Sequence, residues 1–382
     1  MRPRKIMTAL SLAGILAAAA PVNVPAQMDK PESMDQETWA RLRDDVLEYD
    51  EIADLVEQYN PTYQQVIKKI DINKAPMEEA AQALRAEASE MQSDAKEIKD
   101  QNPIIYQTYT AYAKAYKEAA KGFEKAMKSV DSGTKGVLGQ TRKQLTSGVQ
   151  QLMIGYSQAL ASKELVDTSV VLAQAAYDST VTQRNMGMAT DAAVESAWTS
   201  LQSAQVQQQA LNDTLTSLSR QLCYMTGWPY DAVVEIRRAP APNLAEIAAM
   251  NPETDLTKAI GNNYTLIEQR AVVARGTAGQ DARTRTIEEG EAKLKAQLES
   301  LYQTVLEKQK AYEAASTALE GARITMEGND MKYQLGMLGK LQYLQLRLTY
   351  LQQDMAATSA GLELLQAMES YRWAVEGIAD IS

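Results

Sequence analysis

Apolar residues recur at alternating spacings of four and three along most of this sequence. A repeat that averages 3.5 residues keeps one apolar stripe of a helix facing a partner helix, as in a coiled coil. The residues between the stripes are mainly Gln, Ser, Thr, Lys and Glu, which suit faces left to water. The pattern predicts an all-α fold of long antiparallel coiled-coil helical hairpins. We expect the seam to contain Leu211, Leu215, Leu218, Leu222, Leu341, Leu344, Leu348 and Leu351.

Two glycine–methionine pairs interrupt this helical pattern in the same way. Gly187–Met188 and Gly336–Met337 each follow a long helical run, and the two glycines lie 149 residues apart. Glycine is the residue that most often ends a helix, because it adopts the left-handed conformation at low cost. Each pair therefore predicts the turn of a helical hairpin.

The order of elements around the two turns is also the same. We expect long helices at residues 137–184 and 281–334, each followed by a shorter helix that ends at Gly227 or Gly377. The turn glycine and the closing glycine are separated by 40 residues in the first copy and 41 in the second. This matched order predicts two tandem structural repeats. The first would cover residues 27–237 and the second 255–382, joined by a proline-containing linker at 238–254.

The first repeat carries about 50 residues that the second lacks, at about 76–130. They predict an extra helical hairpin that turns at Asn102–Pro103 and ends at Ser132–Gly133. One face of it carries a stripe formed by Ile105, Tyr109, Tyr112 and Tyr116. Such stripes usually pack between helices. The alternative is an aromatic face that contacts peptidoglycan or another part of the cell envelope.

The N-terminus has the features of an export signal. Arg2, Arg4 and Lys5 precede an apolar stretch from Ile6 to Ala20, and an A-x-A-like cleavage site ends at Ala26. The stretch is shorter than the ~20 residues that span a bilayer. We therefore predict a signal peptide at residues 1–26 and an exported protein of the cell envelope, with an uncleaved anchor as the alternative.

The composition argues against several functions. The chain has no histidine, one cysteine (Cys223) and a formal net charge of −10. Without histidine, the common nucleophilic triads and most zinc or haem ligation are unavailable. An acidic chain is also a poor partner for nucleic acid. We expect no enzymatic activity, no catalytic, cofactor-binding or metal-binding residues, and no cofactor.

The sequence at the first turn matches a known pattern. Gly187, Met188, Ala189 and Thr190, with Val194 and Ala197 after them, resemble the hairpin-tip motif G-L-A-T-x-x-D-V-L-x-A of the TolC-like outer membrane factors. In the second copy Gly336 and Leu344 fall on the pattern, and Tyr333 precedes the glycine by three residues. The segment 222–229 resembles the end of that family's repeat. The resemblance covers roughly residues 47–378.

This resemblance implies a TolC-like α-barrel protomer, a duplicated chain that forms a trimeric helical exit duct. The duct would dock through its tips onto a periplasmic adaptor, also called a membrane fusion protein, attached to an ABC or proton-driven pump. Four long helical segments are too few to close a tunnel, whereas three copies supply twelve, so we expect a homotrimer. The tip residues expected to dock on the adaptor are Gly187, Met188, Ala189, Thr190, Gly336 and Met337.

The sequence also departs from the family. The acidic position of the tip motif holds Ala193 in the first copy and Gln342 in the second. Between Val272 and Asp281 the sequence is too short for a pair of membrane-crossing strands. We expect the chain to lack the strands with which family members cross the outer membrane.

Three functions remain open at this point. The first is the efflux or secretion duct, and the second is a structural coiled-coil spacer of the envelope without a transport role. The third, an adaptor protein, is disfavoured because we expect none of the strands of its lipoyl-like module. The duplication favours the duct, because a spacer gains nothing from two inequivalent hairpins with matched tips.

Overall fold

The computed structural model describes residues 35–42, 44, 46–98, 103–229 and 232–381. The chain divides into two compact units, Met1–Arg41 and Leu42–Ser382. In the first unit the described part contains one helix, α1 (Gln36–Arg41). The predicted signal peptide at 1–26 and the turn residue Asn102 lie outside the described residues, as do the side chains of Ile105, Tyr109 and Tyr112. All elements below belong to the second unit.

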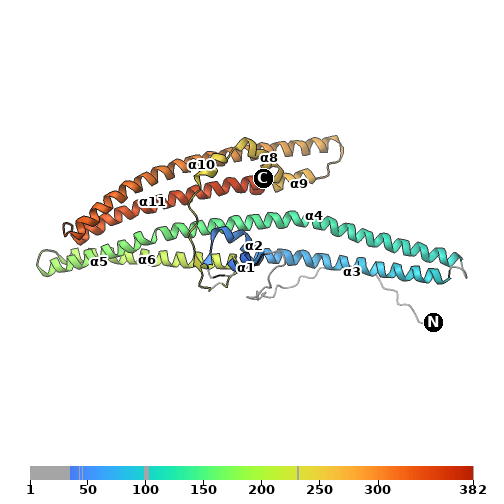
Figure 1. Ribbon diagram of the computed structural model, residues 1–382, viewed down its shortest axis with the longest axis horizontal. Coiled ribbons are helices and arrows are strands. Elements are labelled where there is room, and N and C mark those ends of the chain that lie inside the picture. Colours follow the sequence, from blue (N-terminus) through green and yellow to red (C-terminus); the bar gives the residue numbers. More distant parts are fainter. Residues whose placement is uncertain (1–34, 43, 45, 99–102, 230–231, 382) are drawn as a thin grey trace. The chain divides into compact units, whose positions relative to one another are not determined.

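Three long antiparallel hairpins make up most of the second unit (Figure 1). Among its described residues, no helix combines the length and the apolar character needed to cross a membrane. The predicted all-α fold of long helical hairpins is confirmed. The hairpins pair α3 (Pro61–Ile98) with α4 (Pro103–Ala161), α5 (Lys163–Asn185) with α6 (Asp191–Met225), and α10 (Gly276–Gln334) with α11 (Lys340–Trp373).

Short elements connect the hairpins. Two parallel two-residue strands pair Val46 with Glu235 and Leu47 with Ile236, so the start of the unit is held against the segment after α6. These strands are β1 (Val46–Leu47) and β2 (Glu235–Ile236). The other short elements are η1 (Tyr49–Glu51), α2 (Ile52–Tyr59), α7 (Leu244–Ala249), α8 (Pro252–Asn262), α9 (Tyr264–Ala271) and the π-helix η2 (Ala374–Ile378).

Two predicted boundaries were wrong. Helix α4 runs through Ser132–Gly133 without ending, because a glycine inside a helix costs only ~1 kcal/mol and α3 packs along α4. The run expected from Val137 to Arg184 is broken at Ser162, between α4 and α5. The linker at 238–254 contains α7, whose first turn is capped by Asn243 Oδ1 accepting a hydrogen bond from the Ala245 N–H at 3.2 Å. The repeat boundaries themselves remain predictions.

Two fully buried asparagines form the corners where a short helix meets the next helix. Asn60 joins α2 to α3: its Oδ1 accepts from the Tyr63 N–H at 3.0 Å, and its Nδ2 donates to the Met225 carbonyl at 2.6 Å. Asn263 joins α8 to α9: its Oδ1 accepts from the Leu266 N–H at 3.0 Å. Its Nδ2 donates to the Ala379 carbonyl at 3.0 Å. Each asparagine therefore caps one helix and binds the end of a distant one.

At each corner the asparagine donates to a carbonyl at or just after the end of the second helix of a hairpin, called the return helix here. A glycine with positive φ lies at the end of each return helix. Gly227 (φ 85°) follows α6, and a Cβ there would lie 2.1 Å from the Tyr59 Cβ. Gly377 (φ 101°) follows α11, and a Cβ there would lie 2.2 Å from the Asn262 carbonyl oxygen. Both corners thus need glycine for its conformation and for its size. This correspondence agrees with the predicted duplication.

A cluster of buried side chains lies in the second half of the chain. It joins α8, α9, α10 and α11, with Leu266, Leu294, Leu298 and Leu364 fully buried. The first half is attached to it through polar contacts. Trp373 Nε1 on α11 donates to Gln150 Oε1 on α4 at 2.9 Å. The two halves therefore share a packed centre, and the hairpins extend from it.

We predict that Gly377→Ala destabilises the protein far more than Gly336→Ala. Both glycines have positive φ, which costs an alanine about 1–2 kcal/mol. Only at Gly377 would the new methyl group also overlap backbone atoms, whereas Gly336 has nothing within 4 Å. We expect a loss of at least about 3 kcal/mol at Gly377, measured by urea unfolding followed by circular dichroism. Equal losses would show that the corner is not tightly packed.

Candidate functional site

The first hairpin turn contains the predicted tip residues at 187–190. Gly187 has φ 73° and its N–H donates to the Arg184 carbonyl at 2.9 Å, while the Met188 N–H donates to the Gln183 carbonyl at 2.8 Å. These two bonds are the Schellman motif, which satisfies the carbonyl groups left free at a helix end. The turn needs glycine because the left-handed conformation strains any residue with a Cβ.

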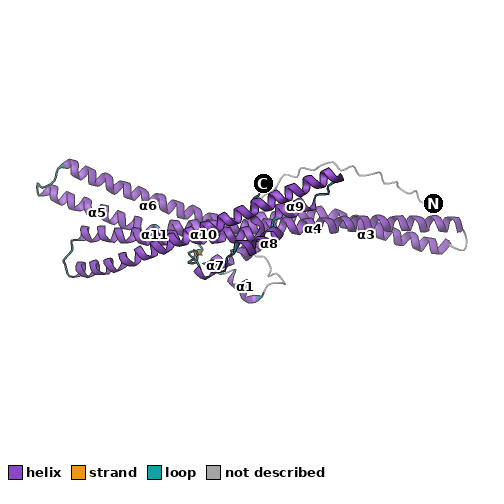
Figure 2. Ribbon diagram, turned by 90° about the horizontal axis from the view of Figure 1, so that it is seen from above, coloured by secondary structure: helices purple, strands orange, loops and turns teal. Residues whose placement is uncertain are grey.

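The second turn repeats this geometry. Gly336 also has φ 73°, its N–H donates to the Tyr333 carbonyl at 3.0 Å, and the Met337 N–H donates to the Lys332 carbonyl at 2.8 Å. In both turns five residues separate the two helices, because α5 ends at 185 and α6 begins at 191, while α10 ends at 334 and α11 begins at 340. The two turns lie at the same end of the unit, and α11 packs against α5 (Figures 1 and 2).

The turns differ in how the returning helix starts. Thr190 caps α6, with its Oγ1 accepting from the Ala193 N–H at 3.2 Å. The corresponding residue before α11 is Gly339, which has no side chain for this role. Arg184 and Asp191 also form an ion pair of 2.8 Å across the first turn. The second turn is instead braced by Tyr333 and Tyr343, whose stacked rings lie 4.1 Å apart between centroids.

Each tip exposes two large apolar side chains. Met188 and Met337 are 72% and 70% exposed, and Met186 and Leu335 are 57% and 72% exposed. Because exposed large apolar groups lie at corresponding positions of both turns, the tips are the candidate surface for a partner. Met186 and Leu335 are not among the predicted docking residues. Their signal in the sequence is that each immediately precedes the turn glycine.

The predicted seam leucines lie on the packed sides of α6 and α11, with unequal burial. Leu222 is fully buried, and Leu344 and Leu351 are 8% and 4% exposed. The remaining five are half-buried: Leu211, Leu215, Leu218, Leu341 and Leu348. On α6 the buried seam leucine, Leu222, lies near the end of the helix that meets the packed centre of the unit, and the half-buried leucines keep part of their surface open in a single chain.

A shallow groove lies next to the first tip, between α5 and α6. Tyr177, Val181, Val194 and Trp198 line it, and the Tyr177 and Trp198 rings lie 5.4 Å apart between centroids. Trp198 is 44% exposed. Arg184, Asp191 and Glu195 also line the groove, so its surface is partly apolar and partly charged.

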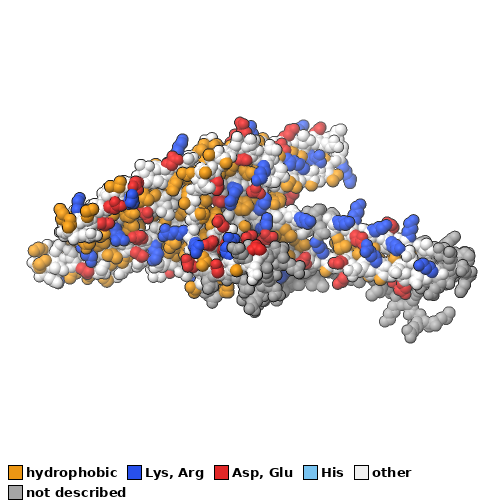
Figure 3. Space-filling view, in the orientation of Figure 1, with side chains coloured by type: hydrophobic (Ala, Val, Ile, Leu, Met, Phe, Trp, Pro, Cys, Tyr) orange, Lys and Arg blue, Asp and Glu red, His pale blue; other side chains and the backbone are white. Residues whose placement is uncertain are grey.

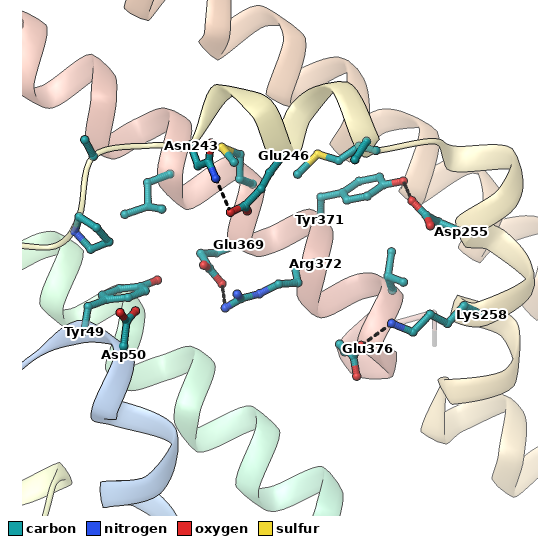
Figure 4. Close-up of a pocket in the computed structure, with 17 residues that line it drawn as sticks. Tyr49, Asp50, Asn243, Glu246, Asp255, Lys258, Glu369, Tyr371, Arg372 and Glu376 are labelled. Atoms are coloured by element: carbon teal, nitrogen blue, oxygen red, sulfur yellow. Dashed lines mark hydrogen bonds and ion pairs between the residues drawn. The ribbon is translucent and has the colours of Figure 1, made fainter. Parts of the chain in front are cut away.

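A second cavity, of about 420 Å³, lies at the packed centre between η1, α7, α8 and α11 (Figure 4). Most of its charged groups have a partner: Glu369 pairs with Arg372, Glu376 pairs with Lys258, and the Asp255 carboxylate accepts a hydrogen bond from the Tyr371 hydroxyl at 2.7 Å. Burial raises the pKa of Glu369 despite the neighbouring Arg372. Because these charged groups bind one another, few of them are available to bind a ligand. We therefore describe this cavity as a contact region between elements and not as a binding site.

No group of three or more His, Cys, Asp or Glu side chains in the described parts of the chain is placed to hold a metal ion. Cys223 is buried and its pKa is raised by burial, so its thiol is a weak nucleophile. The tips and the groove beside the first one are therefore the surface that best fits a functional site.

Comparison with known proteins identifies the fold. No family model matches the sequence, and no curated protein matches it either. Among solved structures, the outer membrane protein VceC of Vibrio cholerae is similar, with 11% identity and a TM-score of 0.51; the match covers 86% of this chain and 96% of that chain. The outer-membrane channel OprN matches with 12% identity over 94% and 97% of the two chains at 0.49. The CmeC outer membrane channel of Campylobacter jejuni matches with 11% identity over 94% and 91% at 0.48.

At such low identity the match to VceC shows the fold alone. The chain has a TolC-like fold, the one found in the outer membrane protein VceC of Vibrio cholerae. The resemblance stated from the tip motif is thereby confirmed at the level of fold. The roles of the tip and seam residues are not tested by it.

We predict that the ion pairs of Glu376 make stability depend on pH. Lys258 and Lys143 lie 2.7 and 3.2 Å from its carboxylate oxygens, and the hydrogen bond from Lys258 is the main cause of its lowered pKa. A carboxyl with a lowered pKa in the folded state stabilises the fold above its ordinary pKa, about 4.3, and loses that contribution as pH falls through the folded value.

The Tm difference between the wild type and Glu376→Gln should therefore be largest near neutral pH and shrink on acidification to about pH 3. Glu299→Gln is the matched control, because its ion pair with Lys295 is 3.9 Å long and both side chains are exposed. A pH dependence as large for Glu299→Gln would refute the assignment to Glu376.

Proposed function

We propose that this protein is the α-helical exit duct of an efflux or secretion system in the cell envelope. Three copies form the duct, and their tips dock on a periplasmic adaptor attached to an inner-membrane pump. The protein would provide a passage for the transported substrate and would not catalyse a reaction. The observation that carries the proposal is the pair of tips, which have the same five-residue loop, the same φ at glycine and two exposed apolar side chains each.

The chemistry of the tips suits an end-on contact between proteins. Met188 and Met337 are flexible and polarisable, so they adapt to a partner's surface better than branched side chains do. The Schellman motif satisfies carbonyl groups at the helix ends, so fewer backbone acceptors at each tip must be desolvated when a partner binds. In a trimer the two tips of each chain alternate around the ring and present six such contacts to the adaptor.

The alternative is a coiled-coil spacer, in which the tips have no partner. A spacer is stabilised by its seam, and exposed apolar tips would only favour aggregation. The matched tips therefore favour the duct. The fold, which is found in an outer membrane protein, supports the same conclusion.

We predict that Met188→Asp combined with Met337→Asp abolishes adaptor binding without changing stability. Both side chains are at least 70% exposed, so the change in unfolding free energy should stay within about 0.5 kcal/mol. A charge in the apolar contact would be desolvated without a partner, which weakens binding strongly. Pull-down with candidate periplasmic adaptors of the same organism, together with an efflux assay, provides the measurement.

Leu222→Asp is the matched control. Leu222 lies in the seam and is fully buried, so the same new charge should cost more than about 3 kcal/mol of stability. Tip variants that leave efflux and binding intact would remove the support for the duct. Native mass spectrometry at micromolar concentration should show a homotrimer, alone or with the adaptor.

A further inference from the structure

The hairpin of α3 with the first part of α4, residues 61–98 and 103–137, is called the arm here. Six exposed lysines follow one another along its second helix, and we call them the lysine stripe: Lys114, Lys117, Lys121, Lys125, Lys128 and Lys135. At 3.6 residues per turn they fall within about 80° of the circumference of α4, and at 1.5 Å per residue the stripe is roughly 32 Å long. Figure 3 shows basic side chains along the α4 edge of the arm.

Most of the lysine stripe has no counter-charge. Within the described parts of the chain, Lys121 is the one member with an ion pair, which it forms with Glu118 at 2.9 Å. Glu124, the other acid of this part of α4 whose side chain is described, pairs instead with Arg85 of α3. No described acid of α3 pairs with the stripe. The stripe is therefore left facing water with most of its charge uncompensated.

The stability of the arm does not explain this arrangement. Like charges three or four residues apart on a helix repel one another, and the five lysines from 114 to 128 form four such neighbouring pairs. Elsewhere the chain compensates an exposed base, because Arg323 on α10 pairs with Glu320 at 2.8 Å and with Glu327 at 2.9 Å. A row of anionic groups along the stripe would relieve the repulsion.

The local charge of this part of the arm is opposite in sign to that of the whole chain. Residues 103–137 carry six lysines and three acids, whereas the chain has a formal net charge of −10. At physiological ionic strength exposed charges are screened over about 8 Å, a distance much shorter than the stripe. A partner that lies along the stripe therefore experiences the local positive charge and not the net charge of the chain.

We propose that the lysine stripe binds a linear polyol-phosphate polymer of the cell envelope. Successive lysines from 114 to 128 are roughly 4.5–6 Å apart along the helix axis, so an extended polymer can place one phosphate against each turn of α4. The stripe is a separate surface from the tips. The proposal therefore goes beyond the duct and does not depend on how many copies assemble.

The residue types distinguish this partner from other anions. All six members are lysine, which binds phosphate as a point charge, whereas planar recognition of carboxylates favours arginine. Surfaces that bind single-stranded nucleic acid combine basic groups with aromatic side chains on which bases stack. The stripe has no aromatic member, and Phe123, two residues from Lys121, lies on the opposite side of α4.

The shape of the stripe also favours a polymer over a lipid surface. The stripe is one residue wide, which suits a chain better than a plane. A flat anionic membrane would also approach α3, which carries seven acids and five bases over residues 61–98 and would be repelled. A single polymer chain can follow α4 without meeting these acids.

Binding of fluorescein-labelled poly(glycerol phosphate) to the full-length protein tests the proposal. The test variant changes four lysines of the stripe: Lys114→Gln, Lys117→Gln, Lys125→Gln and Lys128→Gln. The matched control changes four exposed lysines outside it and alters the net charge equally: Lys68→Gln, Lys69→Gln, Lys295→Gln and Lys310→Gln. Gln forms helices about as well as Lys, so both variants should fold, which circular dichroism checks.

Fluorescence anisotropy in about 50 mM salt should show affinity at least about tenfold weaker for the test variant and changed less than about twofold for the control. The affinity of the wild type should also fall steeply as salt is added. Equal losses in the two variants, or no binding by the wild type, would overturn the proposal.

Two further outcomes would assign the stripe to another partner and also overturn the proposal. The first is tighter binding of single-stranded oligo(dT) than of poly(glycerol phosphate). The second is co-sedimentation with vesicles of phosphatidylethanolamine and phosphatidylglycerol that is lost in the test variant, with no binding of the polymer. The test variant should keep adaptor binding, and Met188→Asp with Met337→Asp should keep polymer binding, so failure of this proposal can be told apart from failure of the duct.

Discussion

The side chains of two buried asparagines fix the positions of the hairpins. Asn60 and Asn263 each cap the start of one helix and donate a hydrogen bond to a carbonyl at the end of another, 165 and 116 residues away in the sequence. A buried amide that lost these partners would pay its full desolvation cost. The return helices are therefore held by a bond with one geometry, and not by apolar packing alone, which tolerates sliding.

A fixed corner matters because the tips lie at the other ends of long helices. Helix α6 runs from Asp191 to Met225, so a small rotation at its corner would displace the tip by several ångströms. A side chain at position 227 or 377 would push the corner apart, because both glycines approach backbone atoms closely. Glycine at these two positions therefore lets each corner pack tightly. Matched corners thus agree with the placement of the two tips at the same end of the unit, whereas their shared φ and hydrogen bonds come from the glycine in each turn.

The sequence predicted the hairpins and their turns because its strongest signals are local and repeated. The 4-3 spacing predicted the hairpins, and the two glycine–methionine pairs predicted the turns. Helix ends that depend on distant contacts could not be read in the same way. Ser132–Gly133 resembles an end but lies inside α4, while Ser162 carries no strong breaker yet separates two helices. The exposure of Leu335 depends on the turn geometry, so the pattern of apolar residues alone did not reveal it.

The spacing of exposed apolar residues also indicates the kind of partner that the tips fit. At the tips, Met188 and Met337 lie in turns and follow no helical period, so they suit a contact made end-on.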